Sequence, residues 1–208
     1  MTLQDISIAL APGTPEWPGD TPYSCGWAWR IADGASVNVS AFTTSPHCGT
    51  HADAPLHVRD GWAAADAMPL EAFVGTARVL TVDPAPRMLE ARDLAALGNS
   101  RIERLLLRTG CSIAGGQFPA AWPVLSVGAV DALMARGLRL LGVDAPSVDE
   151  RESKSLPVHQ ALFAGNAYIL ENLDLRSVAD GTYDLIALPV KLAGLDAAPV
   201  RAALRPLS

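Results

Sequence analysis

Apolar and polar residues alternate with a period of two along much of this chain, and that period is typical of β-strands. Residues 6–10, for example, read Ile-Ser-Ile-Ala-Leu. Short apolar runs bounded by polar residues or glycine are also typical of strands, in this case buried ones. Together these patterns predict strands over residues 6–10, 37–44, 77–82, 105–109, 138–143, 167–170, 183–190 and 200–204.

Helical patterns are fewer. We predict one helix over residues 126–136, because Ser126 is a favourable N-cap residue and Gly137 is placed to end the helix. Residues 89–97 and a segment that follows Pro157 are two further candidates. Many strands with a few interspersed helices predict a mixed α/β (α+β) fold. No repeat or linker divides the chain, which predicts a single domain over residues 1–208.

One segment cannot belong to a regular helix or a central strand. Residues 11–22 read Ala-Pro-Gly-Thr-Pro-Glu-Trp-Pro-Gly-Asp-Thr-Pro, and proline has no amide hydrogen to donate. We therefore expect an ordered loop or a lid there.

Composition excludes several classes of protein. The 208 residues are 50 % apolar, which excludes disorder, and carry a net charge of −6. Without a basic stripe a nucleic-acid partner is not expected, and no apolar run is long enough for a membrane span. The 18 % share of charged residues is low, so part of the surface is expected to be covered by a second copy of the chain. Three scattered cysteines and an N-terminus without a signal pattern predict a cytoplasmic protein.

Three of the four histidines lie within residues 47–57. That stretch reads His-Cys-Gly-Thr-His-Ala-Asp-Ala-Pro-Leu-His, so it offers three imidazoles and the carboxylate of Asp53. These groups are the usual ligands of a catalytic Zn²⁺ or a similar divalent ion. A polar loop whose histidines only bond the backbone is the plainer alternative. A structural zinc site would need more cysteines than Cys48, which we interpret as a small buried side chain.

Two more candidates lie later in the chain. His159 follows a Leu-Pro-Val sequence, and Glu171 ends the apolar run of residues 168–170. Taken alone, each residue is equally consistent with a structural role, because a carboxylate at a strand end is either exposed or buried against a partner.

The motif of residues 47–57 resembles the H-x-G-T-H-x-D-x-P-x-H motif of the cyclase-like metal-dependent amidohydrolases, whose best-known members are bacterial kynurenine formamidases. The resemblance covers nearly the whole chain. It extends to residues 17–22, 144–149, 153–159, 169–173, 185–192 and 198–201. It implies a layered β/β/α fold of the swivelling type and a cytoplasmic homodimer. It also implies hydrolysis of N-formyl-L-kynurenine to L-kynurenine and formate.

The same resemblance implies two divalent metal ions per chain, with Zn²⁺ expected. His47 and His51 would hold the first ion and His159 the second. Asp53 and Glu171 would bridge or contact both ions. The resemblance leaves His57 free as a proton shuttle and places Trp17 against the aromatic ring of the substrate.

Alternatives remain open at this stage. His57 could instead be a further metal ligand, and Trp17 could be a loop-packing residue. Thr50 could orient a metal ligand through its hydroxyl. A related metal-dependent hydrolase acting on another cyclic or acyclic amide, for example of the isatin type, is one alternative function. A non-catalytic metal- or ligand-binding module on this fold is the alternative from a different class. Trp27, Trp29, Trp62 and Trp122 are interpreted as core or interface side chains.

Overall fold

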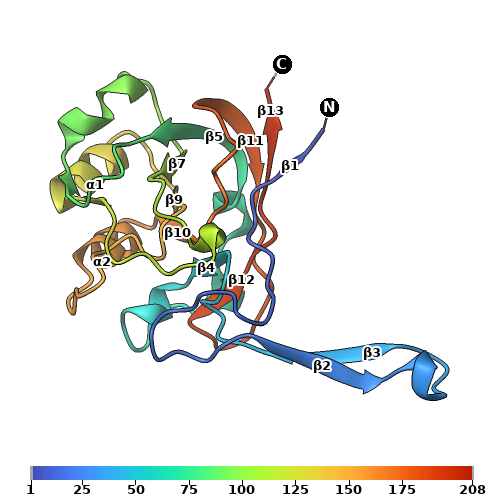
Figure 1. Cartoon of the computed structure of the whole chain (residues 1–208). Coiled ribbons are helices and arrows are strands. Elements are labelled where there is room, and N and C mark those ends of the chain that lie inside the picture. The colour runs from blue at the N-terminus through green and yellow to red at the C-terminus, as the bar shows by residue number, and fades with distance from the viewer. Residues whose placement is uncertain (1, 208) are drawn as a thin grey trace.

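The centre of the molecule is a curled nine-stranded sheet, seen in a computed structural model that describes residues 2–207 (Figure 1). The strands β5, β7, β9 and β10 run parallel to one another, and the remaining neighbours pair antiparallel. Across the sheet the order is β1 (Gln4–Asp5), β13 (Ala203–Pro206), β11 (Gly181–Ile186), β5 (Val74–Thr81), β7 (Arg104–Arg108), β9 (Leu140–Val143), β10 (Tyr168–Glu171), β4 (His51–Asp53) and β12 (Ala197–Pro199).

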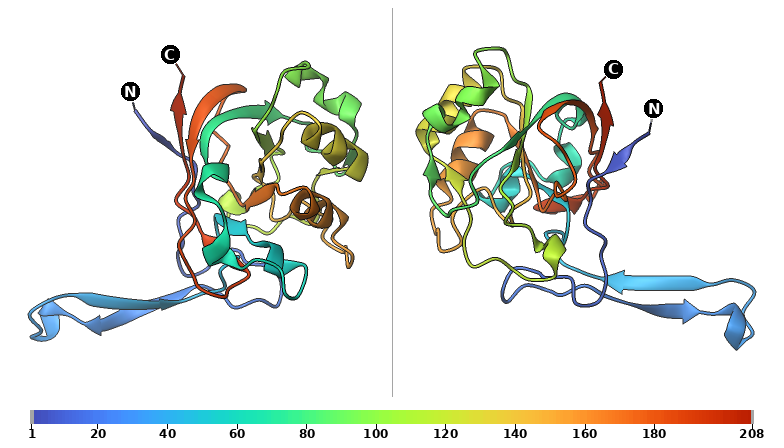
Figure 2. Two further views of the ribbon diagram at one scale, coloured as in Figure 1. Left: turned by 180° about the vertical axis from the view of Figure 1, so that it is seen from behind. Right: turned by 45° about the horizontal axis from the view of Figure 1, so that its top comes forward.

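Two α-helices, α1 (Val127–Met134) and α2 (Pro157–Ala164), contact each other and lie on the same side of the sheet (Figures 1 and 2). Their buried side chains, such as Leu133 and Leu162, form one apolar core with Leu105 and Ile169 of the sheet. A second core lies on the other face. The mixed α/β prediction is confirmed, because few helices cover a sheet of mixed direction.

The helix starts follow their sequence signals. Ser126 caps α1, since its Oγ accepts a hydrogen bond from the amide of Ala129 at 3.1 Å. Proline occupies the first position of α2, where its missing N–H costs nothing. The predicted helix over residues 89–97 is wrong in type, because Ala91–Leu97 forms a 3₁₀ helix (η5). The other 3₁₀ turns are η1 (Ile31–Asp33), η2 (Pro55–His57), η3 (Ala65–Ala67), η4 (Leu70–Ala72) and η6 (Ile113–Gly115).

The strand predicted over residues 6–10 is wrong. Strand β1 ends at Asp5, and residues 6–10 have only an isolated bridge from Ser7 to Leu173. The amide of Ile6 donates to the carbonyl of Ala202, but the next two amides have side-chain acceptors in place of a neighbouring strand, and Ile8 N donates to Thr50 Oγ1 at 2.8 Å. The last predicted strand is displaced, since β13 begins at Ala203. Residues 11–22 contain no helix or strand, as expected.

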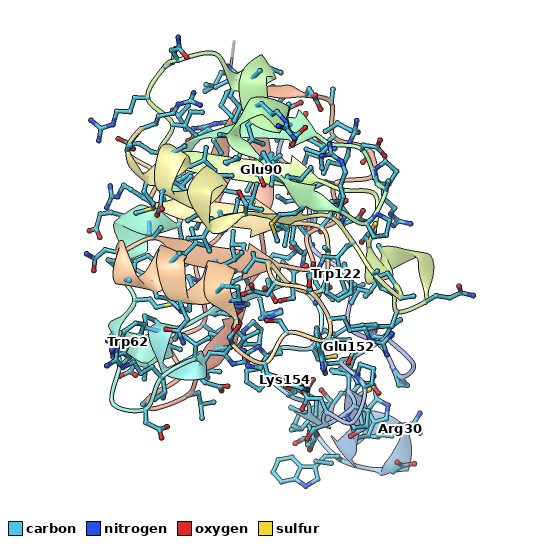
Figure 3. All side chains as sticks on the ribbon, turned by 90° about the vertical axis from the view of Figure 1, so that its left-hand side faces the viewer. Arg30, Trp62, Glu90, Trp122, Glu152 and Lys154 are labelled. Atoms are coloured by element: carbon cyan, nitrogen blue, oxygen red, sulfur yellow. The ribbon has the colours of Figure 1, made fainter. Side chains whose placement is uncertain are left out.

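A two-stranded arm extends from the body (Figures 1 and 2). Strands β2 (Ser24–Trp29) and β3 (Val39–Thr43) pair antiparallel, and every residue of both is exposed. Trp27, Trp29 and Phe42 are 59 %, 61 % and 66 % exposed, so the two tryptophans are not core residues. Figure 3 shows the arm below the body, with Arg30 labelled near its tip. Strand β2 was not predicted. The short pair β6 (Met88–Leu89) and β8 (Val124–Leu125) is separate.

Among residues 2–207, no helix combines the length and the hydropathy that crossing a membrane requires.

Candidate metal centre

The sheet register brings three polar side chains together at one end of β4 and β10. His51 and Asp53 are two residues apart on β4 and therefore lie on the same face of the sheet. In the antiparallel pairing His51 is opposite Glu171, and Asp53 is opposite Ile169. All three polar residues are buried, with exposures of 1 %, 0 % and 4 % for His51, Asp53 and Glu171.

His47 approaches this group from the turn that precedes β4. Its Nδ1 lies 3.0 Å from Asp53 Oδ1. The turn depends on Gly49, which has a φ of +70°, and a Cβ there would lie 2.6 Å from Leu10 Cδ2. The glycine of the motif therefore allows the chain to bring His47 back over β4.

His159 enters from the first turn of α2. Its Nε2 lies 3.2 Å from Asp53 Oδ2 and 3.5 Å from Glu171 Oε1. Its Nδ1 lies 2.7 Å from Asp149 Oδ2, and the same carboxylate accepts the backbone amides of Val158 and His159. Asp149 thus holds both the helix start and the ring orientation, which leaves His159 Nε2 directed at the two carboxylates.

His57, at the end of η2, has a different partner. Its Nδ1 lies 3.2 Å from Asp196 Oδ2, and the same oxygen lies 3.0 Å from His47 Nε2. The ring centroids of His57 and His47 are 4.4 Å apart. The sequence did not single out Asp196. No motif surrounds it, and only the pairing of β12 with β4 brings it to the site.

Two buried atoms of the group lack a hydrogen bond, namely His51 Nε2 and Asp53 Oδ1. They lie 3.2 Å apart, while His51 Nδ1 bonds the carbonyl of Gly49 at 2.9 Å and so points Nε2 into the site. Buried polar atoms without partners are costly, and a metal ion would satisfy both. An imidazole nitrogen beside a carboxylate oxygen is also the donor chemistry of a divalent ion. The residues present fit such an ion.

Asp53 belongs to two of the groups whose donor atoms lie within 4.8 Å of one another. One group joins it to His47 and His51, and the other joins it to His57 and His159. Together with the unpartnered atoms, these groups indicate a divalent metal site. A third group contains His47, His57 and Asp196.

Neighbouring carboxylates favour the protonated form of two imidazoles in this cluster. Burial alone would lower the pKa of His47, but its hydrogen bond to Asp196 and the adjacent carboxylate of Asp53 outweigh that effect and raise the pKa to about 10. Burial likewise opposes the charge on His159, yet Asp149 and Asp53 raise its pKa to about 10. Burial and the neighbouring charge of Asp53 raise the pKa of Glu171 to about 7. Burial lowers the pKa of His57.

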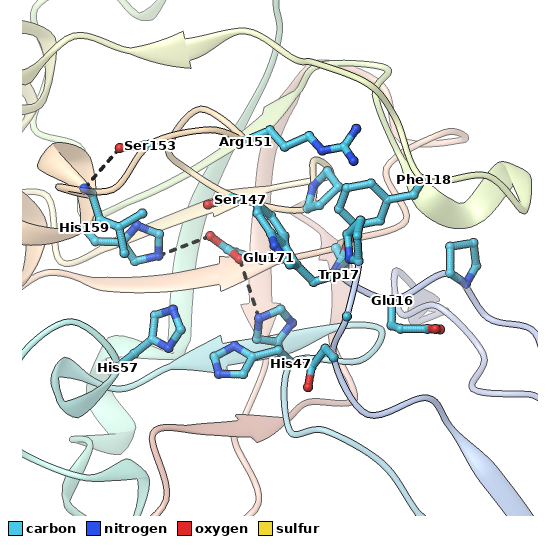
Figure 4. Close-up of a pocket in the computed structure, with 18 of the residues that line it drawn as sticks. Glu16, Trp17, His47, His57, Phe118, Ser147, Arg151, Ser153, His159 and Glu171 are labelled. Atoms are coloured by element: carbon cyan, nitrogen blue, oxygen red, sulfur yellow. Dashed lines mark hydrogen bonds and ion pairs between the residues drawn. The ribbon is translucent and has the colours of Figure 1, made fainter.

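The cluster opens into a pocket of about 460 Å³, a size suited to a small organic ligand. Trp17 forms part of one wall, with its ring 5.4 Å from that of Phe118 at an interplanar angle of 86°. Figure 4 shows His47, His57, His159 and Glu171 on one side of this aromatic pair. The pocket therefore combines a polar floor with an aromatic wall.

The structure thus gathers every residue that the sequence proposed for the site. His47, His51, Asp53, His159 and Glu171 form the cluster, while His57 and Trp17 lie at its edge and in the pocket wall. The role of each residue remains a prediction. Thr50 orients no candidate ligand with its hydroxyl, which donates to the carbonyl of Asn172 at 2.6 Å and so ties β4 to the end of β10.

Comparisons with a family of known proteins and with solved structures extend this picture. The family described as "Putative cyclase" matches residues 4–150. One solved structure is described as a potential metal-dependent hydrolase with cyclase activity. Its sequence is 27 % identical to this chain, the match covers 98 % of this chain and 96 % of the other, and the TM-score is 0.83. A predicted metal-dependent hydrolase from Bacillus stearothermophilus is also 27 % identical, over 98 % and 97 % of the two chains, with a TM-score of 0.82. Isatin hydrolase A from Ralstonia solanacearum shares the fold at 24 % identity, 99 % and 92 % coverage and a TM-score of 0.81.

Proposed function

The chain belongs to the cyclase family, and from that premise we propose that it is a metal-dependent hydrolase of an aryl formamide, with N-formyl-L-kynurenine as its substrate. The observation that carries the proposal is the meeting of the histidine and carboxylate donors with an aromatic wall in one pocket. The donors suit amide hydrolysis, and the wall suits a substrate whose amide nitrogen is attached to an aromatic ring.

The proposal includes two divalent ions per chain, with Zn²⁺ expected from the mixed nitrogen and oxygen donors. His47 and His51 would hold the first ion, His159 would hold the second, and Asp53 and Glu171 would be shared. When bound, such ions polarise a carbonyl and make water acidic enough to supply a nucleophile near neutral pH. Asp53 is well placed for sharing, because Oδ1 faces His47 and His51 while Oδ2 faces His159.

His57 moves the proton in this proposal. Asp196 accepts the hydrogen of His57 Nδ1, so the lone pair lies on Nε2. Because burial lowers its pKa, the ring is neutral at pH 7 and can take a proton from the attacking water. The water oxygen bonds to the formyl carbon, the C–N bond breaks, and Nε2 returns the proton to the leaving aniline nitrogen. The products are L-kynurenine and formate.

Trp17 and Phe118 hold the aromatic ring of the substrate in this arrangement. Their edge-to-face contact leaves Trp17 36 % exposed at the pocket. An aromatic ligand packed against them would gain the burial and ring contacts that such pairs favour.

The second candidate is a cyclic aryl amide of the isatin type, which the shared fold of the isatin hydrolases favours. The two candidates are separated by mixing the metal-loaded protein with N-formyl-L-kynurenine or with isatin and following the ultraviolet absorbance, with and without a chelator. We expect chelator-sensitive turnover of the formamide. Turnover of isatin alone would make a cyclic aryl amide the substrate in place of the formamide. Turnover of neither compound would support a non-catalytic binding module.

We also propose that the protein is a cytoplasmic homodimer. The cytoplasmic location rests on its cysteines, all of which are unpaired thiols. The homodimer is supported by the arm of β2 and β3, because a lone two-stranded hairpin is only marginally stable in water and this one exposes Trp27, Trp29 and Phe42. A second copy that covers the arm would bury these rings.

A further inference from the structure

Outside the candidate metal centre, charged side chains of both signs line the pocket, and each sign comes from its own loop. Glu16 and Asp20 come from the proline-rich loop of residues 11–22, which also supplies Trp17. Arg151 and Lys154 come from the loop between β9 and α2. The pocket is therefore bordered by two carboxylates on one loop and two cations on another.

These four charged side chains form few ion pairs within the protein. Among residues 2–207, Glu16, Asp20 and Lys154 take part in no ion pair. Arg151 has one, from Nε to Glu152 Oε1 at 3.7 Å, and Glu152 is 88 % exposed, so that pair contributes little. Ion pairing within the protein therefore gives no reason for these four charges to border the pocket.

The basic loop is held in place at both ends. Asp149 accepts three hydrogen bonds from the start of α2, and its own carbonyl accepts the indole N–H of Trp122 at 3.0 Å. Near the other end, Leu156 N donates to Ser153 Oγ at 3.1 Å. Arg151 lies with its guanidinium carbon 5.6 Å from the ring centroid of Phe118. A cation held this way loses little entropy when it binds an anion.

Figure 4 shows how the groups are ordered across the pocket. The metal-site side chains His57 and Glu171 lie on one side, and Trp17 and Phe118 lie beyond them. Arg151 and Glu16 lie on opposite sides of these two rings. A ligand in this pocket thus meets donors, then aromatic rings, then a pair of opposite charges.

We propose that Arg151 and Lys154 bind the α-carboxylate of the substrate, and that Glu16 binds its α-ammonium group. The substrate class is then a zwitterionic α-amino acid whose side chain carries an N-acylated aniline. This inference rests on the proposed function and deepens it, since it names the groups that would select an amino acid over an uncharged aryl amide. Arginine suits the role because its planar fork matches a carboxylate in two hydrogen bonds.

The test compares ligands with and without the amino-acid end. N-formyl-L-kynurenine is compared with 2-formamidoacetophenone as substrates, and L-kynurenine with 2-aminoacetophenone as competing ligands. Arg151→Gln should raise KM for the amino acid and weaken L-kynurenine binding by about tenfold, the scale of one charged hydrogen bond. The kcat for the amino acid should stay unchanged. The kinetic constants for 2-formamidoacetophenone and the binding constant for 2-aminoacetophenone should also stay unchanged. Equal effects on both ligand pairs, or no effect on either, would overturn the carboxylate assignment.

Three further variants sharpen the test. Lys154→Met changes an exposed residue that cannot disturb the core, so it replaces Arg151→Gln in the test if the arginine variant does not fold. Lys154→Met should likewise raise KM for the amino acid and weaken L-kynurenine binding. Glu152→Gln, beside Arg151 but highly exposed, is the matched control and should change nothing. Glu16→Gln should remove the preference for N-formyl-L-kynurenine over its deaminated analogue, 4-(2-formamidophenyl)-4-oxobutanoate. An unchanged preference would overturn the ammonium assignment.

The outcomes also separate this inference from the proposed function. If the formamide is turned over and the affinity for L-kynurenine is unchanged in Arg151→Gln and Lys154→Met, the proposed charged subsite is wrong and the proposed activity stands. If no formamide is turned over while L-kynurenine binding depends on both residues, the subsite stands and the proposed reaction is wrong.

Discussion

His51 and Glu171 face each other across neighbouring strands, with Nε2 and Oε2 3.6 Å apart. Backbone pairing of β4 with β10 sets this distance, and Asp53 lies on the same face two residues along. The buried donors therefore come from the rigid centre of the fold, whereas the groups proposed to meet the substrate, Trp17 and Arg151, come from loops. Such a division allows one metal centre to serve different substrates.

Removal of metal is expected to abolish activity. Dialysis against a strong chelator should stop turnover, and Zn²⁺, Mn²⁺ or Co²⁺ should restore it, because His51 Nε2 and Asp53 Oδ1 then regain a partner. Elemental analysis of the dialysed protein is measured beside the rate. Full activity in a verified metal-free sample contradicts the proposal.

Asp53→Asn is expected to lower metal content below two ions per chain, and to do so more strongly than Glu171→Gln. Both oxygens of Asp53 face histidines, whereas Glu171 Oε1 also accepts the amide of Val148 at 2.8 Å. Cys48→Ala is the control, because that side chain is buried nearby and belongs to none of the donor groups found among the described residues. Two retained ions in both carboxylate variants would show that neither carboxylate is shared.

His57→Asn is expected to keep its metal and slow kcat by about 10²–10⁴-fold, the usual cost of a lost acid–base group. His47→Asn should instead lose metal first. If Asp196 acts by orienting His57, Asp196→Ala should slow the wild-type enzyme but have little further effect in a His57→Asn background. Metal loss in His57→Asn equal to that in His47→Asn would make His57 a ligand.

The metal-free protein is expected to lose stability as pH rises from about 6.5 to about 10. In the folded state His47 and His159 have pKa values of about 10, against 6.5 for an unperturbed imidazole, so the folded chain binds more protons than the unfolded chain in that range. The free energy of unfolding must then fall with rising pH. Metal-loaded protein should not show this loss, because a bound ion requires deprotonated ligands. The melting temperature at pH 7 and 9.5, with chelator or with Zn²⁺, measures the difference. Equal slopes with and without metal would contradict it.

The oligomeric state is expected to depend on the arm. Replacing Trp27, Trp29 and Phe42 together with serine should convert the dimer to a monomer, because these exposed rings lose most of the apolar area that a partner would cover. Light scattering after size exclusion measures the mass. Trp62→Ser, on the body, is the control. A wild-type monomer at micromolar concentration would refute the homodimer itself.

The sequence predicted the central strands well, because their residues are buried on both faces and read as unbroken apolar runs. Leu105 and Leu141 are typical examples. The cluster of residues 47–57 was also predictable, since its three imidazoles and Asp53 lie close together in the sequence. For these parts, local pattern and final structure agree.

Other features depend on contacts between distant segments. Asp196 meets His57 only because β12 pairs with β4, and Asp149 meets His159 only because α2 folds back on the loop before it. Strand β2 was missed for another reason. Its sequence, Ser-Cys-Gly-Trp-Ala-Trp, has no buried face to impose an alternation, and both of its faces are exposed.

The arm leaves and rejoins the body at one point, where Ser45 N donates to the carbonyl of Thr21 at 3.2 Å. The chain that enters the arm has just passed Trp17, and the chain that leaves it reaches His47 two residues after Ser45. The two ends of the arm are therefore continuous in the chain with Trp17 and His47 of the pocket. In the proposed homodimer, a partner that covers the arm would contact a segment joined in the chain to a pocket-wall residue at one end and to a candidate metal ligand at the other.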